Sequence, residues 1–367
     1  MINFYLFWLL FYVLFLCMMA RKWSSQKTGN VQNLNGDQVS LIIPFRNESH
    51  NAEELFRQLA KVTEDVSEIL LINDQSEDDS RDIFLRQAEK NERIKIWDSP
   101  GIGKKAAVEF GVAKAKGLII LVSDADCFLS ETWIKKMLEP FSDAKVQLVA
   151  GPVLSKVERI GFFDCFQQIE WASILLMTQF FFRIHRPLMC SAANLAYRKK
   201  AFVSLGGYSG NADIASGDDE FLLKKIVKKY GAAACHYQID RSALVLTRPQ
   251  EDFFALINQR MRWAGKWRQK SSILHWITPV VFALFQAIWI SSMCLPFFGG
   301  IYILLFLGVW GVKVGGESLV LGKVLRSLGK KLPISDFIKT SFFHPFYVIS
   351  TVSGVFFWKF VWKGRSD

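Results

Sequence analysis

Two kinds of hydrophobic run alternate along this chain: long apolar segments near both ends, and short apolar segments between amphipathic stretches in the middle. Residues 1–20 carry no charged side chain and are followed at once by Arg21 and Lys22. A run of this length crosses about 30 Å of hydrocarbon, and a cleaved signal peptide carries its basic residues before the apolar run. The pattern predicts a permanent transmembrane anchor over residues 1–22, followed by a cytoplasmic domain because basic residues favour that side.

The C-terminal part also contains membrane-like segments. Residues 271–312 contain no Asp, Glu, Lys or Arg and are interrupted near Pro296, which predicts a helical hairpin at about residues 273–312. We expect a basic cytoplasmic segment over 313–340 and a third apolar segment over 341–361. Residues 271–367 are therefore predicted as a C-terminal membrane region. The whole pattern is typical of a multi-pass protein of a bacterial-type inner or plasma membrane.

Between these ends, a polar linker over residues 23–38 precedes a domain predicted over residues 39–270, in which short apolar runs alternate with helical patterns. Strands are predicted at 39–45, 68–72, 94–97 and 118–122, and helices at 53–62, 78–90 and 104–116. Short apolar strands that alternate with helices favour an α/β fold with a buried parallel sheet and helices on both faces. Further along, we expect a long aromatic helix at 160–182, a strand at 191–197, a helix up to residue 229 that begins in an acidic triplet, and an amphipathic helix at 251–267.

Acidic side chains follow two of these predicted strands. Asp74 comes directly after the second strand, and Asp124 and Asp126 come after the fourth. Ligands of such sheets bind beyond the carboxyl ends of the strands, so both sites are expected to face one crevice.

Composition and charge narrow the class of protein. The chain is 51% hydrophobic and 14% aromatic, with a formal net charge of +11. Basic residues concentrate at 224–229, 260–268 and 323–331, which favours attraction to a membrane surface. No motif indicates a nucleic-acid partner. The six cysteines are scattered without a C-x-x-C pair, which argues against a disulfide framework or a structural zinc site and fits a reduced, cytoplasmic domain.

The Asp124-x-Asp126 pair is a candidate metal site. Two carboxylates at a strand end offer hard oxygen ligands to Mg²⁺ or Mn²⁺, which would bridge to phosphate groups and neutralise a leaving group. The simpler alternative is a solvated turn.

A second candidate is the acidic triplet Asp218-Asp219-Glu220, predicted at the start of a helix. One of these residues would suit helix capping and the helix dipole. Three adjacent carboxylates repel one another, which raises at least one pKa and suits a general base. The residues alone leave open which of the three is the base.

Two basic motifs could contact phosphate. Lys104 follows a glycine turn at the start of a predicted helix, a good position for a phosphate contact, and its position after the third strand argues against a dinucleotide site. The segment Gln259-Arg260-x-Arg262-Trp263 combines an amide, two guanidinium groups for diphosphate and an indole face for a sugar. Its alternative is an amphipathic helix on the bilayer surface.

Taken in order, these motifs resemble family 2 glycosyltransferases with the GT-A fold. The segments that carry the resemblance are VSLIIPFRNE (39–48), LLINDQS (70–76), GKKAAVEFGVAKAKGLIILVSDAD (103–126), ANLAYRKKAFVSLGGY (193–208), GDDEFLL (217–223) and QRMRW (259–263). They cover about residues 39–267. The last segment is similar to the Q-x-x-R-W motif of the cellulose, chitin and hyaluronan synthase branch.

The resemblance implies a doubly wound mixed sheet with helices on both faces and transmembrane helices at both ends. It implies inverting, metal-dependent transfer of a sugar from a nucleotide-sugar donor, a UDP-sugar, in glycan or polysaccharide biosynthesis. The acceptor would be a lipid-linked or membrane-bound glycan, and membrane lipids would surround the anchors.

The resemblance also implies roles for individual residues. Asp74 would bind the nucleobase, Lys104 the phosphates, and Asp124 and Asp126 the metal, with Asp126 the more direct ligand. Asp219 would be the general base, next to Asp218. The remaining implied contacts, which would close over the diphosphate and the acceptor, are Gln259, Arg262 and Trp263.

Other functions stay open at this point. A catalytically inactive membrane scaffold could keep the same fold, although the acids at 126 and 218–220 are intact. A processive polysaccharide synthase would usually have more membrane spans for a channel, which favours a single addition. A nucleotidyltransferase would place a basic glycine-rich loop after the first strand, where this chain has Pro44 to Glu48. A basic membrane-binding module without chemistry leaves the acids at the strand ends unexplained.

Overall fold

The computed structural model divides into two compact units. The described residues are 1–24, 38–158, 161–210, 217–265, 273–357, 361–362 and 365–366. The sheet unit comprises Ser24–Lys156 and Met177–Arg248, and the helical unit comprises Met1–Trp23, Val157–Leu176 and Pro249–Asp367. Most of the predicted linker at 23–38 and the predicted domain boundary at residue 270 lie outside the described residues.

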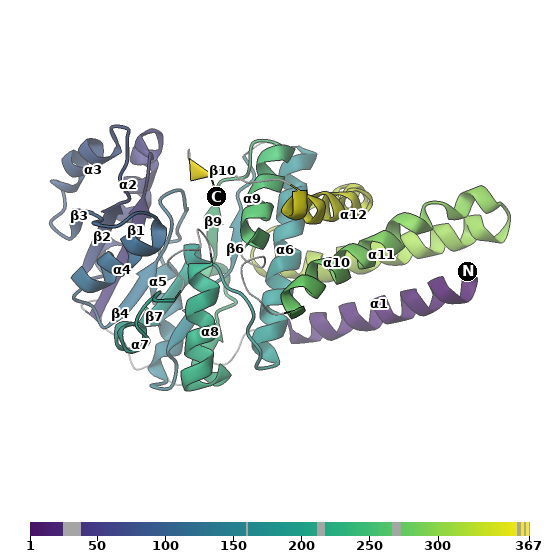
Figure 1. Cartoon of the computed structure of the whole chain (residues 1–367), viewed down its shortest axis with the longest axis horizontal. Helices are drawn as coiled ribbons and strands as arrows, with labels where there is room; N and C mark the ends of the chain where they lie inside the picture. Colours follow the sequence, from purple (N-terminus) through teal and green to yellow (C-terminus); the bar gives the residue numbers. More distant parts are fainter. Residues whose placement is uncertain are drawn as a thin grey trace. The chain divides into compact units, whose positions relative to one another are not determined.

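A seven-stranded sheet with the order β3-β2-β1-β4-β7-β5-β8 forms the centre of the sheet unit (Figure 1). Its strands are β1 (Val39–Phe45), β2 (Glu68–Asn73), β3 (Ile94–Asp98), β4 (Ile119–Val122), β5 (Leu148–Ala150), β7 (Leu195–Arg198) and β8 (Cys235–Tyr237). The first four strands are parallel, whereas β7 runs antiparallel to both β4 and β5. The sheet is therefore mixed, which confirms the predicted fold class. A separate pair joins β6 (Val153–Ser155) to β9 (Val245–Thr247) in parallel.

Every residue of β1, β2 and β4 is buried, as expected for central strands that are covered on both faces. The α-helices of this unit are α2 (Ala52–Ala60), α3 (Ser80–Ala88), α4 (Lys104–Lys114), α5 (Trp133–Leu138), α7 (Lys199–Ser204) and α8 (Asp218–Tyr230). Its 3-10 helices are η2 (Ser49–Asn51), η3 (Thr63–Asp65), η4 (Glu139–Ser142), η5 (Ala192–Asn194), η6 (Ala232–Ala234) and η7 (Arg241–Ala243). Close packing of α4 against the sheet requires a small residue, because a Cβ on Gly111 would lie 2.8 Å from the Ile42 side chain.

One sequence prediction needs correction. The strand predicted at 191–197 begins only at Leu195, because the preceding residues form η5. The Ser191 hydroxyl accepts the Ala193 N–H and caps this short helix. The buried Asn194 side chain donates to the carbonyl groups of Pro152 and Ala243, each at 2.8 Å. The local Ser191 cap competes with the ladder of the sheet, and the two long-range hydrogen bonds of Asn194 hold the segment in place.

The helical unit consists of α1 (Ile2–Lys22), α9 (Phe253–Gly265), α10 (Ile273–Ser292), η8 (Leu295–Phe298), α11 (Ile301–Ser327), α12 (Ile334–Phe357) and the first part of α6 (Phe162–Arg183). The short strands β10 (Val361–Trp362) and β11 (Arg365–Ser366) pair antiparallel. The turn at η8 and the left-handed Gly299 and Gly300 lie where the sequence predicts the hairpin to reverse. Helices α1 and α11 lie side by side, in purple and light green (Figure 1).

Two of the described helices, α1 and α11, are long and apolar enough to cross a membrane, and a shorter apolar helix covers Ala283–Phe298. Helix α11 continues to Ser327, so the predicted hairpin boundary at residue 312 falls inside a helix. The reason is that Lys313 is buried, with its ammonium 2.6 Å from the Glu317 carboxylate one turn further on.

Glu317 connects three helices of this unit. Its carboxylate accepts the hydroxyl of Tyr12 on α1 at 2.8 Å, the ammonium of Lys313 on α11, and the hydroxyl of Ser341 on α12. Lys313 also lies 5.3 Å from the centre of the Trp289 ring on α10. A charged group in an apolar helix bundle needs such partners because its desolvation is otherwise costly.

We expect Gly117→Ala to destabilise the protein by about 2 kcal/mol, because the new Cβ would lie 2.5 Å from the backbone nitrogen of Ser40, which cannot move aside. Thermal unfolding of the full chain in detergent measures the effect. Gly161→Ala is the matched control, since no described residue beyond its own chain neighbours comes within 4 Å of its Cβ position. Equal unfolding temperatures for both variants would contradict the close packing at Gly117.

Candidate active site

The site is built around the start of α4, which lies between the ends of β2 and β4. The backbone N–H of Gly103 donates to Oδ1 of Asp74, which follows β2, at 2.6 Å. The next residue, Lys104, donates from Nζ to Oδ1 of Asp124, which follows β4. The structure thus brings Asp74, Lys104 and Asp124 together at the carboxyl edge of the parallel strands, where ligands of such sheets bind. Gly103 has a φ of 95°, a backbone conformation that favours glycine.

Electrostatic attraction holds Lys104 in its charged form. Burial acts to lower the pKa of the Lys104 ammonium, but the nearby carboxylates of Asp124, Asp218 and Asp219 outweigh that cost and raise the pKa above its ordinary value. The acidic residues at the end of β4 and at the start of α8 therefore share one electrostatic environment with Lys104.

Asp124 and Asp126 fit a divalent cation that takes part of its coordination shell from a substrate. Both side chains are half-buried, and Oδ2 of Asp126 lies 3.4 Å from the hydroxyl of Thr247. Within the described part of the chain, no three His, Cys, Asp or Glu side chains form a ready ligand set. Mg²⁺ in phosphate-transfer sites typically uses one or two carboxylates together with waters and substrate phosphates. A two-carboxylate site of this kind fits the pair.

The acidic triplet at the start of α8 divides into three different environments. Glu220 forms an ion pair with Lys224, one turn along the same helix. Asp219 is half-buried, and its carboxylate accepts the N–H groups of Ala192 at 3.2 Å and Glu220 at 2.7 Å. Asp218 is only 8% exposed, and its Oδ2 has no hydrogen-bond partner among the described residues.

Two buried tyrosines interact electrostatically with Asp218. Burial raises the pKa of Tyr197, on β7, and the Asp218 carboxylate raises it further. Burial likewise raises the pKa of Tyr208, which the charges of Asp218 and Asp219 also affect. Sequence reasoning missed both tyrosines, because nothing in their local pattern distinguishes them from core residues.

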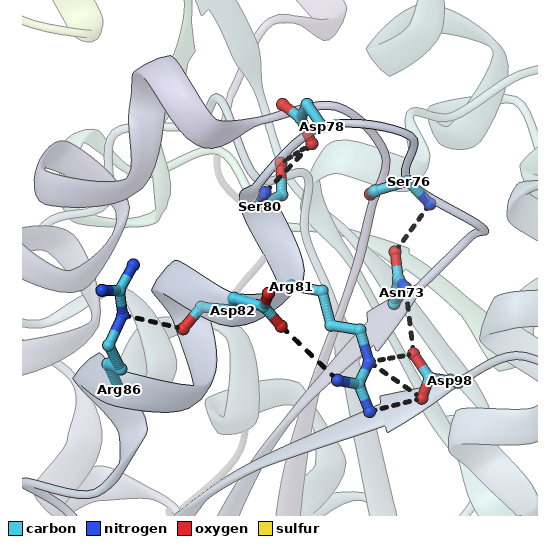
Figure 2. Close-up of polar contacts among 8 residues, drawn as sticks. All are labelled: Asn73, Ser76, Asp78, Ser80, Arg81, Asp82, Arg86 and Asp98. Carbon is cyan, nitrogen blue, oxygen red and sulfur yellow. Dashed lines mark hydrogen bonds and ion pairs between the residues drawn. The ribbon is translucent and has the colours of Figure 1, made fainter.

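A hydrogen-bond network fixes the loop that carries Asp74. Figure 2 shows Asn73 at the end of β2, where its amide nitrogen donates to Asp98 at 2.9 Å and its amide oxygen accepts the N–H of Ser76 at 2.9 Å. Arg81 on α3 holds the same Asp98 carboxylate with two of its nitrogens. The hydrogen bonds from Arg81 lower the pKa of Asp98. The network positions the backbone on both sides of Asp74.

Gln259, Arg262 and Trp263 lie on α9 in the helical unit, and all three are half-buried. The neighbouring Arg260 is the fully packed residue of this motif. Its guanidinium bonds the Glu170 carboxylate on α6 with Nε at 2.8 Å and with a second nitrogen, and both side chains are 7% exposed.

Aromatic rings complete the surroundings of Arg260. Its guanidinium lies 4.2 Å from the centre of the Trp263 ring and 5.2 Å from that of Trp171. The Tyr347 hydroxyl donates to Glu170 at 3.3 Å. Trp263 therefore packs on a buried ion pair. The sequence could have indicated that Glu170 needs a partner, because it is a lone carboxylate in the apolar middle of the helix predicted at 160–182.

Comparison with known proteins shows what kind of domain carries this arrangement. Residues 40–206 match the family model for glycosyl transferase family 2. Over these residues the chain is similar to family 2 glycosyltransferases. The match confirms the predicted enzyme class at the level of the domain. The match assigns no residue roles, so those of Asp74, Lys104, Asp124 and Asp126 stay predictions. It also ends before α8 and α9, which contain the other predicted site residues: Asp218, Asp219, Gln259, Arg262 and Trp263.

Related sequences are distant. The chain is 24% identical over 240 residues to the poly-beta-1,6-N-acetyl-D-glucosamine synthase of Staphylococcus aureus, an alignment that covers 64% of this chain and 55% of that protein. The chain therefore spans about half the length of this curated relative. Glycosyltransferase AglE of Haloferax volcanii is 27% identical over 118 residues, which cover 31% of this chain and 39% of that protein.

A solved structure shares the fold of this chain as a whole. The mannosyltransferase PcManGT from Pyrobaculum calidifontis, in complex with GDP-Man and Mn²⁺, superposes with a TM-score of 0.59. The superposition covers 97% of this chain and 99% of that one, at 13% sequence identity. The likeness supports the GT-A-type sheet together with the helices at both ends of the chain.

Asp78 provides a pH-dependent test of the loop next to the candidate site. Burial acts to raise the pKa of Asp78, but hydrogen bonds from Ser80 and Ser49 lower it to about 2. Because the folded pKa is below the unfolded one, the stabilisation is complete above pH ~4 and is lost as the pH falls through 2. We expect Asp78→Asn to lower the free energy of unfolding by about 1 kcal/mol at pH 7.

Thermal unfolding of both proteins at pH 7 and near pH 2 measures this loss of stability. A loss of equal size at both pH values would contradict the lowered pKa of Asp78.

Glu170→Gln tests the ion pair under Trp263. The substitution leaves the buried Arg260 charge without its counter-ion, which typically costs about 3–5 kcal/mol. We expect a lower unfolding temperature in detergent, with part of the loss recovered in the double variant Glu170→Gln/Arg260→Met. A single variant as stable as the original protein would show that the pair does not stabilise this unit.

Proposed function

We propose that this protein transfers a sugar, with inversion, from a nucleotide-sugar donor to a lipid-linked or membrane-associated acceptor in glycan or polysaccharide biosynthesis. The observation that carries the proposal is the convergence of Asp74, Lys104, Asp124 and the start of α8 at one edge of the sheet. The family 2 domain supports the reaction class.

The donor would lie along this edge. Asp74, which follows β2, is held by a hydrogen bond from the Gly103 N–H. Its carboxylate would hydrogen-bond the nucleobase, for which we expect uracil. Lys104, at the N-terminus of α4, would contact the diphosphate, because both its ammonium and the helix terminus favour anions. Since PcManGT holds GDP-Man, guanine is the alternative base that the donor test must include.

Asp124 and Asp126 would hold Mn²⁺ or Mg²⁺. When bound, the cation would supply charge stabilisation to the departing diphosphate. Their half-buried position keeps both carboxylates accessible to a ligand. Lys104 adds a second positive charge beside the same leaving group.

Asp219 is the proposed general base. Glu220 is engaged in an ion pair with Lys224. Asp218 is buried, whereas Asp219 is half-buried and therefore more accessible to an acceptor. The Asp219 carboxylate would take the proton of the acceptor hydroxyl, whose oxygen then bonds to the anomeric carbon. The bond between that carbon and the diphosphate oxygen breaks, and the nucleoside diphosphate leaves with inversion at the anomeric centre. Asp218 would adjust the charge around the base.

Three residues of α9 stay candidates for donor and acceptor contacts by residue type alone. Gln259, Arg262 and Trp263 offer an amide, a cation and an indole face, which suit a diphosphate and a sugar ring. Within the helical unit, the Trp263 ring packs against the Arg260 guanidinium.

A membrane location supports a membrane-associated acceptor. Helices α1 and α11 are candidate spans, and we propose a multi-pass protein with its catalytic domain in the cytoplasm. We propose a single addition of sugar. The similarity to a poly-N-acetylglucosamine synthase keeps processive synthesis as the second candidate, which the length of the product distinguishes.

The test is transfer by the purified protein in detergent, with UDP- and GDP-sugars, Mn²⁺ or Mg²⁺, and membrane extract as acceptor. We expect metal-dependent release of nucleoside diphosphate and a product with one added sugar by mass spectrometry. Asp126→Ala and Asp219→Asn should each reduce the rate at least about 100-fold, because they remove a metal ligand and the base.

Asp82→Asn is the matched control, since this carboxylate is 74% exposed on α3. It should keep its activity within about twofold, as surface substitutions usually do. Full activity in both Asp126→Ala and Asp219→Asn would overturn the assigned roles. No turnover by the folded protein across the whole panel would favour the inactive scaffold instead.

A further inference from the structure

We propose that Lys104 is an internal counter-cation for Asp124, so that a divalent metal binds well only together with a diphosphate that takes over the Lys104 ammonium. The inference rests on the proposed function, in which Asp124 and Asp126 are the metal ligands. It adds an order to the assembly of the site: the metal and the donor load as one unit.

The first observation is competition for one oxygen. Lys104 Nζ donates to Oδ1 of Asp124. A divalent cation bound at Asp124 would use an oxygen of the same carboxylate. The two side chains are 26% and 36% exposed, so both the ammonium and the carboxylate are accessible to a ligand. A metal ion at Asp124 would place its two positive charges beside the Lys104 charge, and the repulsion weakens metal binding unless the ammonium moves or is neutralised.

The second observation is the supply of alternative partners for the ammonium. Asp218 and Asp219 already attract Lys104 electrostatically. Asp218 is buried, and its Oδ2 accepts no hydrogen bond from any described residue. A buried carboxylate oxygen without a donor is uncommon in folded proteins, because its desolvation is not compensated. This oxygen provides a second position for the ammonium when Asp124 binds a metal.

Diphosphate resolves the competition more completely. The Lys104 ammonium has three N–H donors, so it can exchange its hydrogen bond to Asp124 for hydrogen bonds to phosphate oxygens. Other oxygens of the same diphosphate can serve as ligands of the metal. Metal and diphosphate then each improve the binding of the other. Thermodynamic linkage requires this improvement to be equal in both directions.

Lys104→Met tests the inference by binding rather than by turnover. Titration of Mn²⁺, followed by its electron paramagnetic resonance signal, gives the dissociation constant with and without UDP or GDP. In the unmodified protein we expect nucleotide to tighten Mn²⁺ binding at least tenfold. In Lys104→Met, Mn²⁺ alone should bind about tenfold more tightly, and the nucleotide should add much less.

Two matched variants isolate the position of the charge. Lys114→Met removes the same charge from the other end of α4 and should leave Mn²⁺ binding unchanged. Lys104→Arg keeps the cation and should retain the coupling to nucleotide. Unchanged or weaker binding of Mn²⁺ alone in a folded Lys104→Met protein would overturn the inference.

Asp218→Asn tests the second position of the ammonium. The substitution should weaken Mn²⁺ binding more in the original background than in Lys104→Met, because only the original protein has an ammonium to relocate. Equal effects in both backgrounds would exclude Asp218 as that position.

Asp126→Ala separates the two levels of the proposal. If Mn²⁺ binding does not depend on Asp126, the proposed metal site is wrong, and the inference falls with it. If binding depends on Asp126 but does not respond to Lys104→Met, the metal site stands and only the role of Lys104 is overturned.

Discussion

The common edge at which parallel strands end is the constraint on which the candidate site depends. Residues that follow β2 and β4 are far apart in sequence, yet β1 lies between these two strands and pairs with both. The start of α4 then joins the two ends, because consecutive residues bond Asp74 through the Gly103 backbone and Asp124 through the Lys104 side chain. A glycine at this turn allows the backbone to approach Asp74 while the following lysine reaches the other carboxylate. The buried sheet thus determines which polar groups can act together.

In the helical unit, the constraint is the hydrogen bonding of largely buried carboxylates by side chains from several helices. Glu317 receives hydrogen bonds from α1, α11 and α12, and Glu170 on α6 receives Arg260 from α9 and Tyr347 from α12. Apolar contacts between such helices do not specify one register, whereas a carboxylate that loses a partner is strongly penalised. Helix α12 contributes to both clusters, so its position is determined at two points. The aromatic residues around Arg260 then orient Trp263 in turn.

The sequence predicted the parts of the fold that depend on local pattern. The first four strands are parallel, and β1 runs over the predicted residues 39–45. The antiparallel insertion of β7 between β4 and β5 could not be predicted, because it depends on pairing between residues far apart in the chain. Helix α11 continues past the predicted hairpin boundary at residue 312 for a related reason. Lys313 looked like a flanking charge, but a partner four residues on and an indole ring on another helix allow it to be buried.

Within the candidate site, residue type indicated which groups to consider but not the different environment of each. Three adjacent acids at the start of α8 are equivalent in the sequence. The fold separates them, because helical geometry places Glu220 over Lys224 one turn later and directs Asp219 to the Ala192 N–H at the end of another segment. Asp218 stays buried and interacts electrostatically with Lys104, Tyr197 and Tyr208. The same geometry explains why Arg260 rather than Arg262 meets Glu170: only one face of α9 is buried, and it contains Leu256, Arg260 and Met261. Assigning function to one member of a cluster of like residues therefore requires the face and the partner of each, and neither can be deduced from the order of residues alone.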